Sequence, residues 1–321
     1  MNHAERARVR LAGSRPARLA ALWLACIAFV ALFAELFASE APIVAIGPRG
    51  ASAFAAVTSA AEYATLSRDA VLARHARDFA VWPVWKSGPQ RRSEVGPDAP
   101  PSVVHPLGTD THGRDVLAIV VHGARGVTGP LLVGLFFATA LGVALGTVAG
   151  TRGGVFEALV LRCAELCAAV PTVLVAAVVA ALAPHRTGTA LVVAIALVRW
   201  AEVARVVRYE SIRLATSNVG MAARALGCTE LQIARRHLLP RVLPALVVET
   251  AGALPALVWT EAAVSFLGID VSASWGSLIA DAFTRGGSTS GAACAVVLVI
   301  LTASAATLLA ESVRDALSPK R

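Results

Sequence analysis

Long apolar segments alternate with shorter polar ones along most of this chain. Crossing a hydrocarbon core of roughly 30 Å takes about 20 helical residues, and six segments approach or exceed that length. They are Leu19–Ala38, Val127–Thr151, Leu166–Ala183, Gly188–Val207, Val242–Leu267 and Gly291–Ala310. A backbone in lipid has to satisfy its own hydrogen bonds, so each segment is predicted to be a helix. The pattern therefore predicts an all-α integral membrane protein with six transmembrane helices.

The composition agrees with a membrane protein. Of the 321 residues, 56% are hydrophobic and 16% are charged, and the mean hydropathy is +0.67. Soluble domains are roughly half apolar and about a quarter charged. The net charge of +8 is also found in nucleic-acid-binding proteins, but here the arginines gather in particular loops between apolar segments. That distribution follows membrane topology and predicts no nucleic-acid partner.

The positions of the arginines predict the orientation. Five arginines precede the first apolar segment, and the loop before the fifth segment holds seven more: Arg205, Arg208, Arg213, Arg224, Arg235, Arg236 and Arg241. The short loops on the other side contain only Arg186 and Arg285. Because basic loops stay in the cytoplasm, both termini are predicted to be cytoplasmic.

The first apolar segment is predicted to remain as an anchor rather than to be removed as a signal peptide. Its run of about 20 apolar residues is longer than a signal-peptide core. The only small-residue candidate for cleavage, Ser39-Glu40-Ala41, is followed by Pro42, which disfavours cleavage.

Four regions follow from this topology. Residues 1–38 are a basic cytoplasmic N-terminus with the first transmembrane helix, 39–126 an extracytoplasmic loop region, 127–315 a core of five transmembrane helices, and 316–321 a cytoplasmic tail. Within the loop region, Ala51–Asp78 has a helix-forming composition. The Pro- and Gly-rich stretch after it is predicted to be irregular, with a short strand at Val81–Trp85.

The second apolar segment carries three glycines on one helix face. Gly142, Gly146 and Gly150 are spaced four residues apart, and small residues at that spacing let another helix approach closely. Glycine is also frequent in membrane helices in general. The shared register favours a packing face against a neighbouring helix.

The stretch AARALGCTELQIARRHLLP, Ala222–Pro240, interrupts the apolar pattern before the fifth span. Gly227 suits the left-handed conformation that ends a helix, and Thr229 can cap a second helix that begins near Glu230. That helix would present Leu231, Ala234 and Leu238 on one face and end at Pro240. The residues alone leave two interpretations open, a docking hairpin for another protein or an amphipathic connector lying on the bilayer.

This stretch resembles the cytoplasmic EAA loop of ABC-importer permeases, where Ala-Ala, Gly and Leu-Pro recur at the same spacing. The chain as a whole resembles the second permease subunit of the dipeptide/oligopeptide/nickel import family. The resemblance covers residues 105–315 and is carried also by HPLGTDTHGRDVL (His105–Leu117), HGAR (His122–Arg125), LGVALGTVAG followed by RGG, RWAEVARVVR (Arg199–Arg208) and EAAVSFLGIDVSASWGSLIADA (Glu261–Ala282).

The chain departs from this family at several positions. Met221 stands where the family has the Glu of its EAA signature. The family's Phe-Leu-Gly-x-Gly becomes Phe266–Asp270, and the linker to Trp275 is short. These departures affect one loop contact and the outward-facing end of the solute path.

The resemblance implies a type I ABC importer permease in a bacterial inner membrane. Its partners would be a second permease subunit, two ATPase subunits and an extracytoplasmic solute-binding protein. The cytoplasmic coupling loop, 215–240, would bind the ATPases through Ala222, Ala223, Gly227, Cys228, Glu230, Arg235, Leu239 and Pro240. The chain has no G-x4-G-K-[ST] phosphate loop, so ATP and Mg would be bound by the ATPase subunits and no cofactor by this chain.

The resemblance points to a peptide-like solute, a dipeptide or oligopeptide. Nickel or another non-peptide solute is the alternative within the same type of importer. A proton-coupled secondary transporter is a more distant alternative, because such proteins usually show more spans and related halves with broken helices.

Four charged residues lie in or near the predicted spans. Glu249 and Glu261 fall within the fifth span, where they either line the solute path or make hydrogen bonds between helices. Glu35 and Arg199 are closer to span ends, from which their charged groups can reach the interface.

Histidine and cysteine give little indication of a metal site. His105, His112 and His122 are seven and ten residues apart without an acidic cluster beside them, so a nickel site is not predicted. Cys163 and Cys167 are one helical turn apart but have no His or Cys partner nearby, and they are predicted to be small, buried apolar residues.

Overall fold

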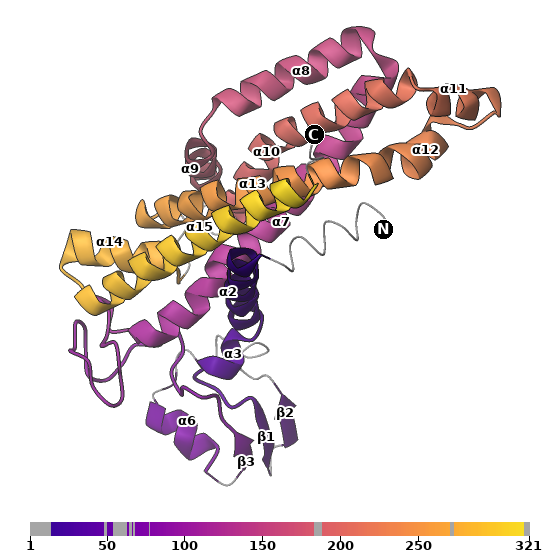
Figure 1. Ribbon diagram of the computed structural model, residues 1–321. Helices are drawn as coiled ribbons and strands as arrows, with labels where there is room; N and C mark the ends of the chain where they lie inside the picture. Colours follow the sequence, from indigo (N-terminus) through magenta and orange to yellow (C-terminus); the bar gives the residue numbers. More distant parts are fainter. Residues whose placement is uncertain are drawn as a thin grey trace. The chain divides into compact units, whose positions relative to one another are not determined.

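The computed structural model describes residues 14–47, 50–53, 63, 66, 68–76, 78–182, 188–269 and 273–317 (Figure 1). These residues are mostly helical and include one three-stranded sheet. The chain forms two compact units. Unit 1 comprises Met1–Leu22, Pro130–Thr260 and Ala303–Arg321, and unit 2 comprises Trp23–Gly129 and Glu261–Thr302.

From α7 onward the helices follow one another with short connections, whereas longer segments precede and follow α6. They are α2 (Arg15–Leu32), α3 (Ala34–Phe37), α6 (Arg68–Arg74), α7 (Val116–Arg152), α8 (Gly154–Ala169), α9 (Thr172–Leu182), α10 (Thr189–Ala215), α11 (Asn218–Ala225), α12 (Glu230–Ile233), the π-helical turn η1 (Ala234–Leu238), α13 (Leu239–Phe266), α14 (Trp275–Arg285) and α15 (Thr289–Leu317).

Four helical segments of the described chain are long and apolar enough to cross a membrane. They are Arg15–Leu32, Val116–Arg152, Glu230–Phe266 and Thr289–Leu317. The pair α8 and α9 provides a fifth candidate, although the two helices are bent by 89° relative to each other. The predicted count of six spans is therefore not confirmed by the part of the chain that the structure describes.

The third predicted span, Leu166–Ala183, is wrong as a single helix. Helix α8 ends at Ala169, and Val170 takes an extended conformation with φ −93° and ψ 125° before Pro171. Proline restricts the residue before it to extended backbone and cannot donate the helical hydrogen bond. The apolar run is thus divided into two helices by a proline that hydropathy does not register.

The fourth predicted span, Gly188–Val207, lies almost entirely inside α10, which continues to Ala215. This helix also carries Arg199, Glu202 and Arg205. The charges distinguish α10 from the helices that qualify as spans by composition.

Unit 1 is organised around α10. Its residues Trp200, Ala201 and Ala204 pack with Val160 and Ala164 of α8 in one buried cluster. Cys167 is partly buried against this cluster, whereas Cys163 is exposed, so the predicted burial of Cys163 is wrong. A second cluster joins α10 to the helices that follow it and contains Val203, Val207, Leu214, Ala223, Ile233, Leu238, Val242 and Leu246. Because α10 contributes to both clusters, its position relative to α8 and α13 is set by burial on two sides.

Unit 2 contains a small antiparallel sheet that the sequence analysis did not predict. Its strands are β1 (Val44–Gly47), β2 (Gly50–Ala53) and β3 (Phe79–Val81), in the order β2-β1-β3, with Val44 opposite both Ala53 and Val81. The helix predicted over Ala51–Asp78 is therefore wrong at its start, where β2 lies, whereas α6 is helical near its end. Residues 54–62, 64, 65, 67 and 77 lie outside the described part. The predicted strand at Val81–Trp85 is displaced, because β3 ends at Val81.

The remainder of unit 2 is held together by α14 and the start of α7, which begins at Val116 rather than near residue 127. The Trp275 side chain is 1% exposed, and its Nε1 donates to the Val120 carbonyl at 2.9 Å. A Cβ on Gly123 would lie 2.5 Å from Trp275 Cδ1, so the indole fits only over a glycine. One large aromatic side chain thereby joins the two helices within this unit.

Candidate functional site

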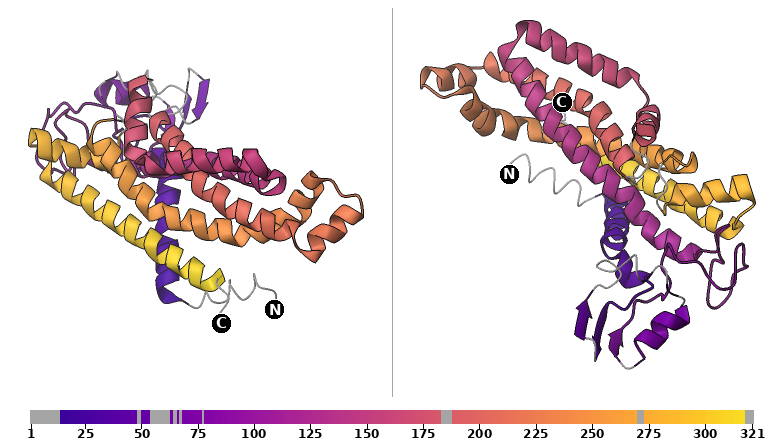
Figure 2. Two further views of the ribbon diagram at one scale, coloured as in Figure 1. Left: turned by 90° about the horizontal axis from the view of Figure 1, so that it is seen from above. Right: turned by 180° about the vertical axis from the view of Figure 1, so that it is seen from behind.

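Helices α11 and α12 form a hairpin that projects from the ends of α10 and α13 in unit 1 (Figure 2). The Ser217 hydroxyl caps α11 by accepting a hydrogen bond from the Gly220 N–H at 3.2 Å. A Cβ on Gly220 would lie 2.1 Å from the Leu214 carbonyl oxygen. The chain can therefore turn tightly from α10 into α11 only with glycine at this position.

The bend between α11 and α12 has the geometry predicted from its residues. Gly227 has a φ of 82°, in the left-handed region that favours glycine. Thr229 and Gln232 form a capping box, in which the Thr229 hydroxyl accepts from the Gln232 N–H and the Gln232 side chain accepts from the Thr229 N–H. Two short helices are thereby joined with their end groups hydrogen-bonded.

Pro240 does not end the second helix, contrary to the sequence prediction. Helical structure runs from Glu230 to Phe266, with η1 between α12 and α13. The π-helical turn puts Ile233 and Leu238, five residues apart, in the same buried cluster. This wider turn also corrects the predicted apolar face, because Leu231 is 78% exposed whereas Leu238 is 4% exposed.

The predicted coupling residues divide between the inside and the outside of the hairpin. Ala223 is buried, and Cys228 is half-buried and packs against the cluster that joins α10 to α13. The exposed members are Ala222, Gly227, Glu230, Arg235, Leu239 and Pro240. The outer surface of the hairpin is therefore available to a partner, and Cys228 is only partly accessible.

Two residues that the sequence analysis did not single out as site residues dominate this outer surface. Leu226 is 85% exposed and Leu231 is 78% exposed, on either side of Gly227. Met221, at the position of the family's Glu, is 53% exposed. The sequence has large aliphatic side chains on both sides of a glycine in a polar loop, and this pattern could have identified Leu226 and Leu231 as candidate surface contacts. Such exposed apolar groups mark an interaction surface when they are clustered.

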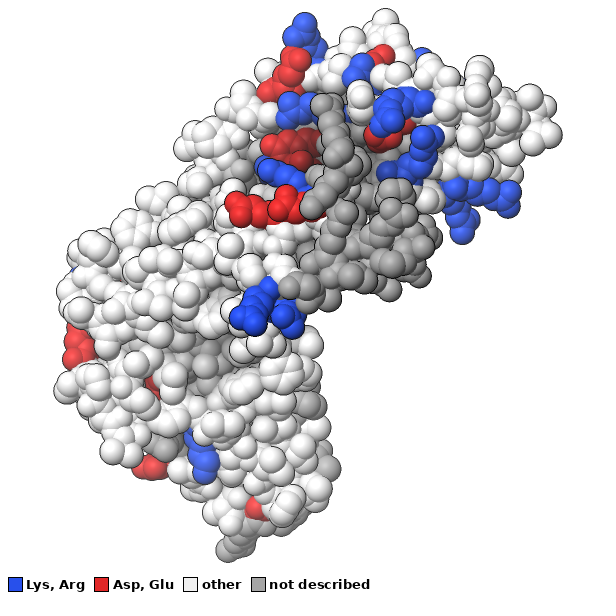
Figure 3. All heavy atoms as spheres, viewed as in Figure 1, with Lys and Arg blue, Asp and Glu red and all other residues white. Residues whose placement is uncertain are grey.

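An ion pair joins the two helices of the hairpin. Arg224 Nε and Nη2 donate to the two carboxylate oxygens of Glu230 at 2.7 and 3.2 Å, and Arg224 Nη1 donates to the Ala215 carbonyl at 3.1 Å. The hydrogen bond to Glu230 raises the pKa of Arg224. On the face shown in Figure 3, Lys and Arg side chains gather over this end of unit 1, whereas much of the surface over α15 is uncharged.

The three predicted packing glycines of α7 face α10. A Cβ added to Gly142 would lie 2.5 Å from Val203 Cβ, and one added to Gly146 would lie 2.5 Å from the Ala204 carbonyl oxygen. At Gly150 the nearest atom would be Ser211 Cβ, also at 2.5 Å. The two helices are thus in contact along a stripe where no larger residue fits.

The two predicted path glutamates lie in different surroundings. Glu249 of α13 is 31% exposed at its side chain and pairs with Arg199 of α10 at 3.3 Å. Arg199 also pairs with Glu202, so this guanidinium is engaged rather than extended to an interface. Glu261 is 2% exposed and accepts a hydrogen bond from the Ser265 hydroxyl at 2.9 Å.

Glu35 also has a partner within the chain. Its Oε1 lies 3.0 Å from Arg125 Nη1, and both residues belong to unit 2. The Arg125 Nε donates in addition to the Ala31 carbonyl at 3.0 Å. These contacts place Glu35 in an ion pair with α7, where the sequence analysis expected a side chain reaching the interface alone.

The three histidines have separate partners. His105 bonds to Asp115, and His122 Nε2 bonds to the Ala38 carbonyl oxygen. His112 lies with Asp110 and Asp281, whose possible ligand atoms are all within 4.8 Å of one another. This is a combination that the sequence analysis did not single out.

Arginines already occupy the carboxylates of this group. Arg114 Nη2 lies 2.6 Å from Asp110 Oδ2, and Arg285 Nη1 lies 3.2 Å from Asp281 Oδ1. Arg285 also contacts His112 at 3.1 Å. Because two guanidinium groups balance the two carboxylates, the electrostatics of the group do not favour a divalent cation.

Comparison with known sequences shows extended similarity to transport proteins. Residues 142–321 match the family described as binding-protein-dependent transport system inner membrane component. The chain is 31% identical over 238 residues to the dipeptide transport system permease protein DppC of Bacillus subtilis, which covers 72% of this chain and 73% of that protein.

Two further relatives are also peptide transport proteins by name. Identity to DppC of Alkalihalophilus pseudofirmus is 32% over 231 residues, or 68% of this chain and 73% of that protein. Identity to the oligopeptide transport system permease protein OppC of Bacillus subtilis is 31% over 192 residues, or 57% of this chain and 61% of that protein.

Proposed function

The chain belongs to the family of binding-protein-dependent transport system inner membrane components, and we propose that it is the permease subunit of an ATP-driven importer of short peptides. With a second, related permease subunit it forms the solute path. An extracytoplasmic binding protein delivers the peptide, and two ATPase subunits drive the change between inward- and outward-facing states.

The observation that carries this proposal is the exposed apolar tip of the α11–α12 hairpin. Leu226 and Leu231 extend from a rigid pair of capped helices whose inner side is buried against α10 and α13. Movement of the tip is therefore transmitted to α13 through continuous helix from Glu230 onward. A hairpin with these properties suits a coupling element between an ATPase and the solute path.

We also propose which side of the membrane each part of the chain occupies and which subunits bind ATP. Both termini and the hairpin lie in the cytoplasm, and the loop region 39–126 lies outside, in agreement with the arginine distribution. ATP and Mg bind to the ATPase subunits, and this chain binds no cofactor. The ATPase subunits hydrolyse ATP, and the resulting movement reaches this chain through the hairpin.

A short peptide is the solute that the relatives' names favour. Nickel is the less favoured alternative, since the three histidines are separated and the Asp110–His112–Asp281 group is balanced by Arg114 and Arg285.

Uptake by a reconstituted complex tests the proposal. The chain is incorporated into proteoliposomes with its genomic partner permease and ATPases, and the binding protein is added outside with radiolabelled dipeptide or with radioactive nickel. We expect ATP-dependent accumulation of the dipeptide and none of nickel. A complex whose ATPases carry an inactive phosphate-loop lysine is the control. ATP-dependent uptake of nickel without uptake of any dipeptide would overturn the peptide assignment.

A further inference from the structure

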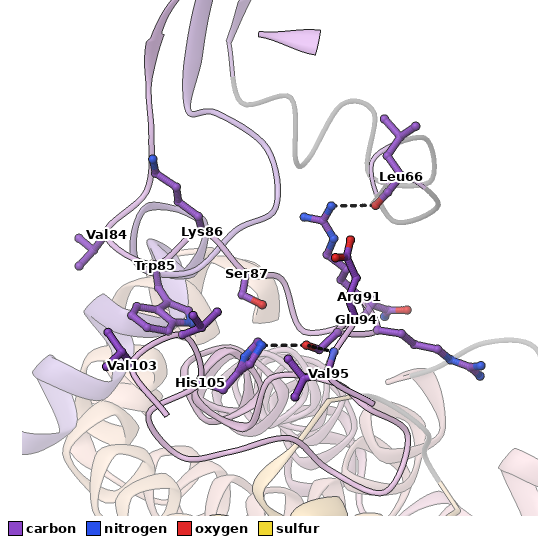
Figure 4. Close-up of a pocket in the computed structure, with 14 residues that line it drawn as sticks. Leu66, Val84, Trp85, Lys86, Ser87, Arg91, Glu94, Val95, Val103 and His105 are labelled. Atoms are coloured by element: carbon purple, nitrogen blue, oxygen red, sulfur yellow. Dashed lines mark hydrogen bonds between the residues drawn. The ribbon is translucent and has the colours of Figure 1, made fainter. Parts of the chain in front are cut away.

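Ser93 opens onto a hollow of about 830 Å³ in unit 2, in the segment between β3 and α7 (Figure 4). Figure 4 shows His105 between Trp85 and Val95, and a dashed line marks its hydrogen bond to Ser93. Ser93 lines the hollow and is half-buried. Binding pockets for small molecules have volumes of roughly 300–1,000 Å³. The hollow therefore gives a small molecule access to the Ser93 hydroxyl.

Ser93, His105 and Asp115 form a continuous relay of hydrogen bonds. His105 Nε2 lies 2.8 Å from the Ser93 hydroxyl oxygen, and His105 Nδ1 lies 2.6 Å from Asp115 Oδ2. His105 and Asp115 are both buried, so the inner two members of the relay are shielded from water. A hydroxyl, an imidazole and a carboxylate joined in this order are the arrangement that activates a serine as a nucleophile.

Asp115 sets the direction in which the relay donates its protons. Its carboxylate accepts from Trp85 Nε1 at 2.9 Å and from the Ala118 N–H at 3.2 Å, at the start of α7. Because a carboxylate only accepts, His105 donates to Asp115 from Nδ1. The neutral imidazole then has an unprotonated Nε2, which accepts the hydrogen bond from the Ser93 hydroxyl. The Ser93 proton therefore points at a basic nitrogen that is held in place from behind.

A second relay of the same kind in unit 2 shows what distinguishes Ser93. The Tyr63 hydroxyl oxygen lies 2.9 Å from His75 Nε2, and His75 Nδ1 lies 2.7 Å from Asp78 Oδ2. Tyr63 is buried and is not part of the lining of the hollow. That relay joins buried segments without exposing its hydroxyl group. Ser93 differs because its hydroxyl is at the end of a relay and beside an open hollow.

We propose that Ser93 is an activated nucleophile and a site of covalent acylation by a small activated ester. Ser93 Oγ bonds to the acyl carbon while its proton passes to His105 Nε2. The ester C–O bond then breaks, and the leaving oxygen takes this proton and departs as the alcohol. The acyl group remains on Ser93 Oγ. Val95 and Val103 line the hollow and are 65% and 96% exposed, so they offer apolar surface to the acyl chain.

Labelling of the full-length chain in lipid nanodiscs with an alkyl fluorophosphonate tests the site. This probe reacts with activated serines as an activated ester does, with loss of fluoride, but its product is stable and mass spectrometry of the digested chain locates it. Ser87 is the internal control, because it lines the same hollow, is also half-buried and has no histidine partner among the described residues. We expect Ser93 to be labelled at least about a hundredfold faster than Ser87, which is the contribution of a positioned general base. His105→Gln should remove this advantage, whereas Ser87→Ala should leave the labelling of Ser93 unchanged.

The decisive comparison is made within the wild-type chain, so it does not depend on whether a variant folds. Equal labelling rates of Ser93 and Ser87, or no labelling of Ser93, would overturn the inference and reduce the relay to a packing element like that of Tyr63. The proposed transport function is tested separately, because dipeptide uptake by the complete complex does not require an activated serine. Absent uptake with rapid labelling of Ser93 would therefore remove the transport proposal and leave this inference intact.

Discussion

Arg199 of α10 and Glu249 of α13 form an ion pair, with 3.3 Å between Nη2 and Oε1, although they are 50 residues apart in the chain. The same guanidinium pairs with Glu202 one helical turn further along α10. One arginine therefore pairs with two carboxylates, and all three side chains are partly exposed. Removing a single partner from such a group leaves the remaining charge uncompensated, and this lowers the stability of the folded chain.

From this arrangement we expect Arg199→Met to be more destabilising than Glu249→Gln, because only the former removes the cation that is paired with both Glu202 and Glu249. The loss should be about 1–3 kcal/mol for Arg199→Met, below the range for fully buried pairs because the side chains are partly exposed. Thermal unfolding of the purified chain in detergent measures it. Arg213→Met, in an exposed pair with Glu210 on the same helix, is the control and should change little. Equal effects of the Arg199 and Glu249 changes would contradict the shared-cation arrangement.

The contact between α7 and α10 predicts a different response at two glycines. Gly146→Ala places a Cβ 2.5 Å from the Ala204 carbonyl oxygen and should destabilise unit 1 by about 1–3 kcal/mol. Gly252→Ala is the matched control, since a Cβ at that position of α13 has no atoms within 4 Å and alanine favours helix by about 1 kcal/mol. Melting temperatures of the two variants should therefore shift in opposite directions or only the first should fall. A fall of similar size in both would show that the close approach is unimportant.

The exposed tip of the hairpin is expected to bind the ATPases. Leu226→Asp and Leu231→Asp should each reduce co-purification of the ATPase subunits by about tenfold or more, because a charge replaces an apolar anchor. Folding should persist, since both side chains are mostly exposed. Asn218→Asp adds the same charge elsewhere on the exposed surface of the hairpin and should leave co-purification intact. Normal ATPase recovery with both leucine variants would remove the hairpin tip from the interface.

At Gly227 the backbone conformation, rather than the space around the residue, is expected to limit which side chains are tolerated. A Cβ at Gly227 meets nothing within 4 Å, but its φ is 82°. Gly227→Val should therefore impair coupling of ATP hydrolysis to uptake, whereas Gly227→Asn should be tolerated because asparagine adopts this conformation at lower cost. The ratio of peptide transported to ATP hydrolysed is the measurement. Equal ratios for the two variants would exclude a role for the bend geometry.

Glu40 of unit 2 predicts a pH dependence of stability. The side chain is 8% exposed and its Oε2 has no hydrogen-bond partner among the described residues. Burial raises the pKa of Glu40, and the nearby Arg91 acts in the opposite direction. Because the folded chain binds this proton more tightly than the unfolded chain does, the stabilisation is present below the ordinary carboxyl pKa and is lost as the pH rises through the raised value.

Replacing Glu40 by glutamine should remove this dependence. Glu40→Gln is expected to exceed the wild type in stability near neutral pH by about 1.4 kcal/mol for each unit of the pKa shift, and to match it near pH 4. Melting temperatures between about pH 4 and about pH 8 test this. Glu94→Gln, an exposed carboxylate of the same unit, controls for the loss of a charge. A Glu40→Gln variant that is less stable than the wild type at every pH tested would contradict this interpretation.

Much of the architecture followed from the sequence because it depends on local properties of the chain. Apolar length and arginine position predicted a helical membrane protein, and the family of the chain was recognisable from motifs such as RWAEVARVVR. The bend at Gly227 and the cap at Thr229 were predictable because glycine conformation and side-chain capping involve only neighbouring residues.

Features that join distant segments required the tertiary structure. The π-helical turn η1 carries the helix past Pro240 and turns Leu231 outward, because burial of Ile233 and Leu238 against α10 outweighs the local helical register. Hydropathy could not divide the third predicted span at Pro171, nor could it pair Arg199 with Glu249 across 50 residues. Periodicity reports which face of a segment is apolar, whereas the partner of that face is set by packing between helices, and only the folded chain specifies it.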